Sequence, residues 1–80
     1  MPPDANDKIL LDRIENNFTY HPPTPEQAPK YQRLRATAKE LARLVVELVP
    51  EGRERSLALT HLEEMVMFAN AGIARASQAV

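Results

Sequence analysis

The seven prolines of this 80-residue chain decide where it can and cannot be helical. Proline lacks a backbone N–H and its ring clashes with the preceding turn, so a helix tolerates it only in its first turn. After two prolines at the N-terminus, the others lie within residues 22–29 and at Pro50. The pattern predicts an all-α protein: a short N-terminal helix, a proline-rich elbow, and a long antiparallel two-helix hairpin that oligomerises.

The N-terminal helix is predicted over Asp7 to Asn16. Ile9, Leu10 and Ile14 stand at helical offsets behind an Asp that can serve as the N-cap. We expect one domain over residues 1–80, in which 1–23 form the short helix and the elbow and 24–80 form the hairpin.

The first hairpin helix has a clear start signal. Thr24 can accept as N-cap, Pro25 suits the first helical position, and Gln27 completes a capping box. Pro29 conflicts with a regular first turn, because it lacks an N–H to donate. The helix therefore either kinks at Pro29 or begins near it.

Apolar residues spaced alternately by three and four predict the seam of the hairpin. On the first helix these are Tyr31, Leu34, Ala38, Leu41, Val45 and Leu48. Pro50 and Gly52 break the helix and turn the chain, and the second helix starts at about Arg53 or Glu54. Its seam positions are Ala58, Leu62, Met65, Ala69, Gly72 or Ile73, and Ala76.

The chain has more apolar residues than one hairpin needs. A second set widens each stripe: Ala42, Val46, Val49, Leu59, Val66, and Met67 or Phe68. Large apolar patches rarely persist on soluble monomers, and a small domain without cysteine needs another source of stability. We therefore expect a homo-oligomer. No apolar run reaches the roughly 20 residues of a membrane span, so we expect a cytoplasmic protein with no membrane partner.

Charge is unevenly distributed along the chain, although its net value is only −1. Residues 1–27 carry two basic and five acidic side chains, and residues 28–50 carry five basic and two acidic ones. A short basic segment suits a small anion, whereas a nucleic acid polymer would need a wider basic field. An ordinary solvated helix face remains the alternative.

Residues for catalysis or metal binding are scarce. There are two histidines, no cysteine and no spacing typical of metal ligands. The adjacent acids Glu63 and Glu64 point to different sides of a helix, so they cannot act as an acid/base pair on one bond. We expect neither an enzyme nor a metal or cofactor.

Binding residues are better represented. The elbow FTYHPPTPEQ, residues 18–27, carries Phe18 and Tyr20 on a backbone stiffened by proline, which lowers the entropy lost on binding. Phe18 is expected to pack the elbow onto the hairpin, and Tyr20 either packs likewise or stacks on a base. Arg35 and Lys39 lie four residues apart on one helix face, where both can reach a phosphate.

Three stretches carry a family resemblance: IENNFTYHPPTPEQAPKY, LRATAKELARLVVELVP and RERSLALTHLEEMVMFANAGIAR. Together, from about Ile14 to Arg75, they resemble the phage anti-CBASS cyclic-oligonucleotide sponge family. The resemblance implies a helical-hairpin protein that assembles as a hexamer in the cytoplasm of the infected bacterium. It would sequester cyclic dinucleotides such as cyclic GMP-AMP, and cyclic trinucleotides, without cleaving them. The antiphage effectors that these messengers activate would then stay inactive.

The resemblance also implies roles for individual residues. Tyr20 in F-T-Y-H-P-P would stack on a base, and Arg35 in L-R-A-T-A-K would pair with a phosphate, with Lys39 as a further candidate. Thr37 and Arg75 would serve a separate trinucleotide site. The alternative is a helical hairpin that docks onto another protein and has no nucleotide ligand.

Overall fold

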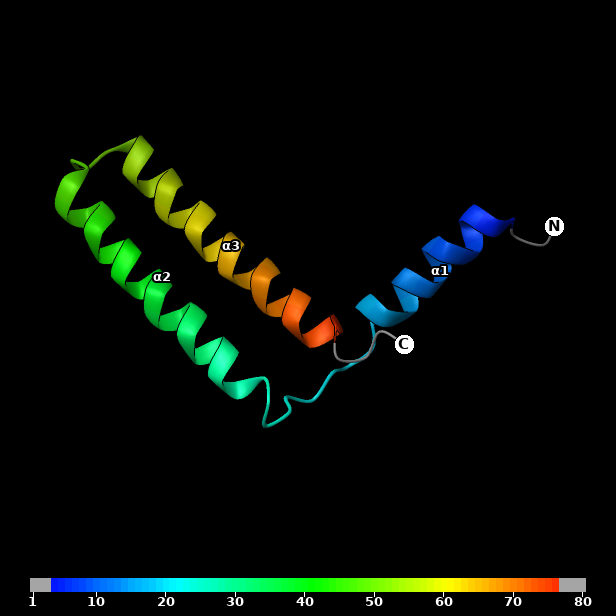
Figure 1. Ribbon diagram of the computed structural model, residues 1–80. Coiled ribbons are helices and arrows are strands. Elements are labelled where there is room, and N and C mark those ends of the chain that lie inside the picture. The colour runs from blue at the N-terminus through cyan, green and yellow to red at the C-terminus, as the bar shows by residue number, and fades with distance from the viewer. Residues whose placement is uncertain (1–3, 77–80) are drawn as a thin grey trace.

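The computed structural model describes residues 4–76, which form three helices and no strand. They are α1 (Ala5–Asn17), α2 (Ala28–Leu48) and α3 (Arg53–Ala76). Helices α2 and α3 lie side by side and antiparallel, while α1 extends away from the open end of their hairpin (Figure 1). The all-α class and the helical hairpin are confirmed. The radius of gyration is 17.3 Å, against about 12 Å for a compact domain of this length.

Helix α1 begins earlier than the sequence predicted because Asp4 caps it. The Asp4 carboxylate accepts a hydrogen bond from the Asp7 N–H at 2.9 Å. This bond satisfies one of the free N–H groups at the helix start, so Asp7 lies in the first turn and is not the cap.

Helix α2 begins next to Pro29, and Thr24 starts a turn instead of the helix. The Gln27 N–H donates to the Thr24 carbonyl at 3.0 Å, and the Gln27 side chain accepts from the Thr24 N–H at 3.0 Å. Helical geometry starts at Ala28, so Pro29 falls in the first turn, where its missing N–H costs no hydrogen bond. Of the two alternatives for Pro29, a helix start near it is correct.

The hairpin connection is short and follows the predicted break. Val49 is extended, with φ −108° and ψ 124°, and its N–H donates to the Val45 carbonyl at 2.9 Å. The Gly52 carbonyl then accepts from the Ser56 N–H at 3.2 Å, which starts α3. Because the link between Leu48 and Arg53 is this short, α3 must return along α2.

The seam between α2 and α3 differs from the predicted one at several positions. The partly buried residues on the α2 side are Tyr31, Leu34, Ala38, Ala42, Val45 and Val49. On α3 they include Leu59, Leu62, Val66, Ala69 and Ile73. The predicted seam residues that are exposed instead are Leu41, Leu48, Ala58, Met65 and Ala76, and of the alternatives Gly72 and Ile73 it is Ile73 that is partly buried.

The reason for this difference is the helical period. A seam of alternating threes and fours keeps 3.5 residues per turn only if the helices supercoil. The observed α2 seam repeats after 11 residues, from Tyr31 to Ala42 and from Leu34 to Val45. That repeat corresponds to about 3.67 residues per turn, close to a straight helix. On α2 the straight-helix period therefore places Ala42 and Val49 at the seam where the heptad pattern predicted Leu41 and Leu48.

Apolar side chains remain open to solvent on all three helices. No apolar residue among residues 4–76 is buried. Phe18, expected to pack on the hairpin, is instead 85% exposed, and Phe68 on α3 is 74% exposed. None of the described helices combines the length and the apolar character needed to cross a membrane.

Candidate functional site

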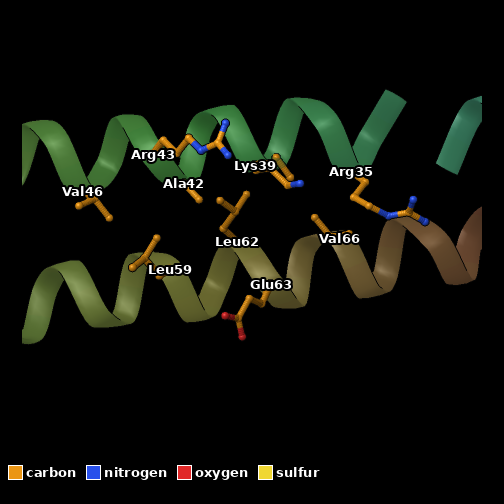
Figure 2. A pocket seen from close by; sticks show the side chains of 10 residues that line it. Arg35, Lys39, Ala42, Arg43, Val46, Leu59, Leu62, Glu63 and Val66 are labelled. Carbon is orange, nitrogen blue, oxygen red and sulfur yellow. The ribbon is translucent and has the colours of Figure 1, made fainter. Parts of the chain in front are cut away.

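A basic-rimmed apolar groove runs along one face of the hairpin. Arg35, Lys39 and Arg43 follow one another at four-residue intervals on α2, so they form one row (Figure 2). The remaining lining side chains are Ala38, Ala42 and Val46 from α2 and Leu59, Leu62, Glu63 and Val66 from α3. The groove has a volume of about 670 Å³, which is within the range of small-molecule sites.

Within residues 4–76 none of the three cations of the groove forms an ion pair with an acidic side chain. Among residues 4–76 the ion pair that forms is between Lys8 and Asp12 on α1, at 3.8 Å. Glu63 contributes to the groove lining, yet its carboxylate points away from α2 (Figure 2). The groove thus offers uncompensated positive charge beside apolar surface, a combination that suits a ligand with both phosphates and flat bases.

Arg35 and Lys39 were predicted from their spacing, and Arg43 was not. Arg43 continues the same interval by one further turn of α2. Extending the four-residue spacing beyond Lys39 would have identified it from the sequence.

Tyr20 does not line this groove in its own chain. It lies in the non-helical connection between α1 and α2 and is 80% exposed. Its backbone is anchored on both sides to the end of α1. The Thr19 hydroxyl donates to the Glu15 carbonyl at 2.5 Å, and His21 Nε2 bonds the Asn16 carbonyl at 2.7 Å.

The hydrogen bond of His21 determines its tautomer. A carbonyl oxygen only accepts, so Nε2 must carry the proton. The second ring nitrogen, Nδ1, is buried and has no hydrogen-bond partner among the described residues. His21 therefore ties the residue after Tyr20 to the end of α1. No group of three potential metal ligands forms within residues 4–76.

Thr37 lies in a second hollow of about 470 Å³, separate from the groove. Lys30, Arg33, Leu34 and Ile73 line it with Thr37. Arg75, predicted to act with Thr37, is partly buried in the last turn of α3, two residues beyond Ile73. The sequence prediction missed Lys30 and Arg33, whose spacing relative to Thr37 already places them on one face of α2.

These features define a small helical-hairpin protein with a basic-rimmed apolar groove. The chain matches the model of the Acb2/Tad1 hairpin domain over residues 11–74, which is most of its length. It therefore belongs to this family, the anti-CBASS cyclic-oligonucleotide sponges, and the predicted family is confirmed. No curated protein and no solved structure matches the chain. The match includes Tyr20, Arg35, Thr37 and Lys39, and ends just before Arg75.

Proposed function

We propose that this protein binds cyclic dinucleotides such as cyclic GMP-AMP, and cyclic trinucleotides, and sequesters them without cleavage. The observation that carries the proposal is the groove rimmed by Arg35, Lys39 and Arg43 in a chain of the sponge family. A cyclic dinucleotide brings two phosphodiester charges and two bases. The cation row can pair with the phosphates, and the apolar floor can receive a base.

Tyr20 completes the site from a neighbouring protomer. Within one chain the ring is exposed and lies outside the groove, so it can stack on a base held by another copy. Stacking of an aromatic ring on a base contributes roughly 1 to 3 kcal/mol. Oligomerisation and ligand binding would then be coupled.

The hollow at Thr37 is our candidate for the trinucleotide site. Lys30 and Arg33 supply two positive charges there, and the Thr37 hydroxyl can donate or accept a hydrogen bond. Arg75 adds a further cation near the same end of α3. Copies arranged around a symmetry axis would present several such sets to one ring of three phosphates, which is consistent with a hexamer.

Sequestration requires a high affinity and enough binding sites for the messenger that is present. It does not require any bond of the ligand to be broken. A nanomolar dissociation constant corresponds to roughly 12 kcal/mol. A single open groove is too shallow to supply it, whereas a pocket closed by two protomers buries both faces of the ligand. With the messenger held at this affinity in the bacterial cytoplasm, effectors that need it stay inactive.

Ligand profiling by calorimetry tests the proposal. Purified protein is titrated with a panel of cyclic dinucleotides and trinucleotides, then denatured, and the released nucleotide is analysed by chromatography. We expect tight binding of at least one cyclic dinucleotide and its recovery intact. Recovery of a linear nucleotide would show that the protein cleaves its ligand and is an enzyme. No binding to any member, together with capture by a protein partner, would favour a docking module instead.

A further inference from the structure

Gln27 is the one buried polar side chain among residues 4–76, with 4% of its surface exposed. It is buried in a chain that buries none of its apolar side chains over the same range. Burial of a primary amide is unfavourable unless both its ends are hydrogen-bonded. The position therefore calls for a specific explanation.

Both ends of the Gln27 amide have partners on different elements. Its Oε1 accepts from the Thr24 N–H at 3.0 Å, and its Nε2 donates to the Ile73 carbonyl of α3 at 3.0 Å. The partners fix the orientation of the amide, because an N–H can only donate and a carbonyl can only accept. Ile73 lies in the last turn of α3, where backbone carbonyls commonly accept hydrogen bonds from groups outside the helix. Gln27 thus caps α3 from the start of α2.

These two hydrogen bonds link Gln27 to a segment of each candidate site. Thr24 ends the segment that carries Tyr20, so the first bond fixes how that segment enters α2. Ile73 lines the hollow that contains Thr37, so the second bond fixes a wall of that hollow. Gln27 itself lies neither in that hollow nor in the groove of the cation row.

We infer that Gln27 is a positioning residue for both nucleotide sites. It holds the segment before α2 and the end of α3 in the geometry that the ligands need, although it touches neither ligand. Without it, binding must itself order these segments, and the entropy lost in doing so weakens affinity. This inference rests on the proposed function, since it assigns a role within the same sites.

The principal test is the variant Gln27→Met, which keeps the length of the side chain and removes both hydrogen bonds. We expect the dissociation constants for a cyclic dinucleotide and a cyclic trinucleotide to rise about ten-fold each, measured by calorimetry well below the melting temperature. Val49→Ala is the matched control, because it weakens the hairpin at its closed end and Val49 lines neither site. Its melting temperature should fall while both affinities stay at the wild-type value.

A second variant, Gln27→Glu, tests the hydrogen bonds themselves. An ionised carboxylate can accept from Thr24 but repels the Ile73 carbonyl, whereas a protonated one can accept and donate as the amide does. Affinity relative to the wild-type protein should therefore be low at pH 7.5 and recover towards pH 5. Glu26 and Lys30 line a further hollow of about 650 Å³ together with Gln27 itself, so each pH needs its own wild-type measurement.

Hydrogen exchange of the wild-type protein covers the case in which a variant does not fold. The Thr24 amide should be protected before any ligand is added. Protection of this amide that arises only with ligand would overturn the inference. Wild-type affinity in Gln27→Met would also overturn it, and so would a loss of affinity in Val49→Ala equal to the loss in Gln27→Met. If the wild-type protein binds no cyclic nucleotide, the proposed function itself fails, and this result is distinct from the others.

Discussion

Tyr20 combines an exposed ring with a fixed backbone. The side chain is 80% exposed, and the flanking residues Thr19 and His21 are both hydrogen-bonded to the end of α1. Because the residues on both sides of Tyr20 are tied to α1, little backbone entropy is lost when a base stacks on its ring. The residue can therefore contribute affinity without contributing to the stability of its own chain.

Replacement of Tyr20 separates stacking from folding. Tyr20→Ala should weaken cyclic dinucleotide binding about five-fold to 150-fold, the equivalent of roughly 1 to 3 kcal/mol. Tyr20→Phe keeps the ring and should bind nearly as the wild-type protein does. Calorimetry of the two variants, with mass measurement by light scattering, makes the comparison. Equal affinity in Tyr20→Ala and wild type would exclude the stacking role.

Arg35 should act through phosphate charge. Arg35→Ala removes a charged hydrogen bond worth about 1.5 to 3 kcal/mol, so affinity for a cyclic dinucleotide should fall about ten-fold to a hundred-fold. It should also make binding less sensitive to salt. Arg53→Ala at the start of α3 is the matched control, because Arg53 is exposed and lies outside the groove. The same loss in both variants would indicate general charge instead of a specific contact.

The α2 residues that face α3 follow the period of a straight helix. The last seam position of α2 tests this register, because the two periods place different residues there. Leu48 is 68% exposed, whereas Val49 is partly buried. Val49→Ala should lower the free energy of unfolding by about 1 kcal/mol, and Leu48→Ala by less than about 0.5 kcal/mol. Chemical denaturation of both variants measures the difference. A larger effect from Leu48→Ala would support the heptad seam.

The sequence was sufficient to predict which elements form, and insufficient for their register. Pro50 and Gly52 mark the turn, and the helices begin close to their predicted starts because caps and prolines act locally. On α2 the heptad and 11-residue seams differ at Leu41 or Ala42 and at Leu48 or Val49, and all four residues are apolar. Local pattern cannot separate them, because supercoiling depends on the partner helix.

The candidate site could likewise be predicted from the sequence only in part. Arg35 and Lys39 share a face of one helix, so their spacing alone brought them together. Gln27 was recognised as part of a capping box, but its bond to Ile73 crosses 46 residues and could not be read from sequence. Tyr20 has no place in the groove of its own chain, so no argument from one chain alone can position it.

The molecule as a whole exposes more surface than a stable monomer of its size. Its accessible area is 6794 Å², against about 4,900 Å² for a compact folded chain of this mass. Much of the excess is apolar, including the α1 residues Ile9 and Leu10 and the α3 residues Met67 and Phe68. Association between copies would remove this surface from water.

Phe68 offers a direct test of association. It is 74% exposed in a single chain, so Phe68→Asp should disturb the isolated hairpin little but destabilise an apolar interface strongly. We expect the wild-type protein to sediment as a multiple of 9.0 kDa and Phe68→Asp to sediment as a smaller species. Gln32→Asp, at an exposed position of α2, should not change the mass. A wild-type protein that sediments as a monomer would contradict the proposed assembly.

Native mass spectrometry of the protein with one cyclic dinucleotide and one cyclic trinucleotide tests binding and assembly in a single measurement. A homo-oligomer that carries intact copies of both ligands, with loss of the dinucleotide alone in Tyr20→Ala, is the expected result. A monomer without ligand, or an oligomer whose nucleotide is found cleaved, would contradict the proposal that this hairpin sequesters cyclic messengers between its copies.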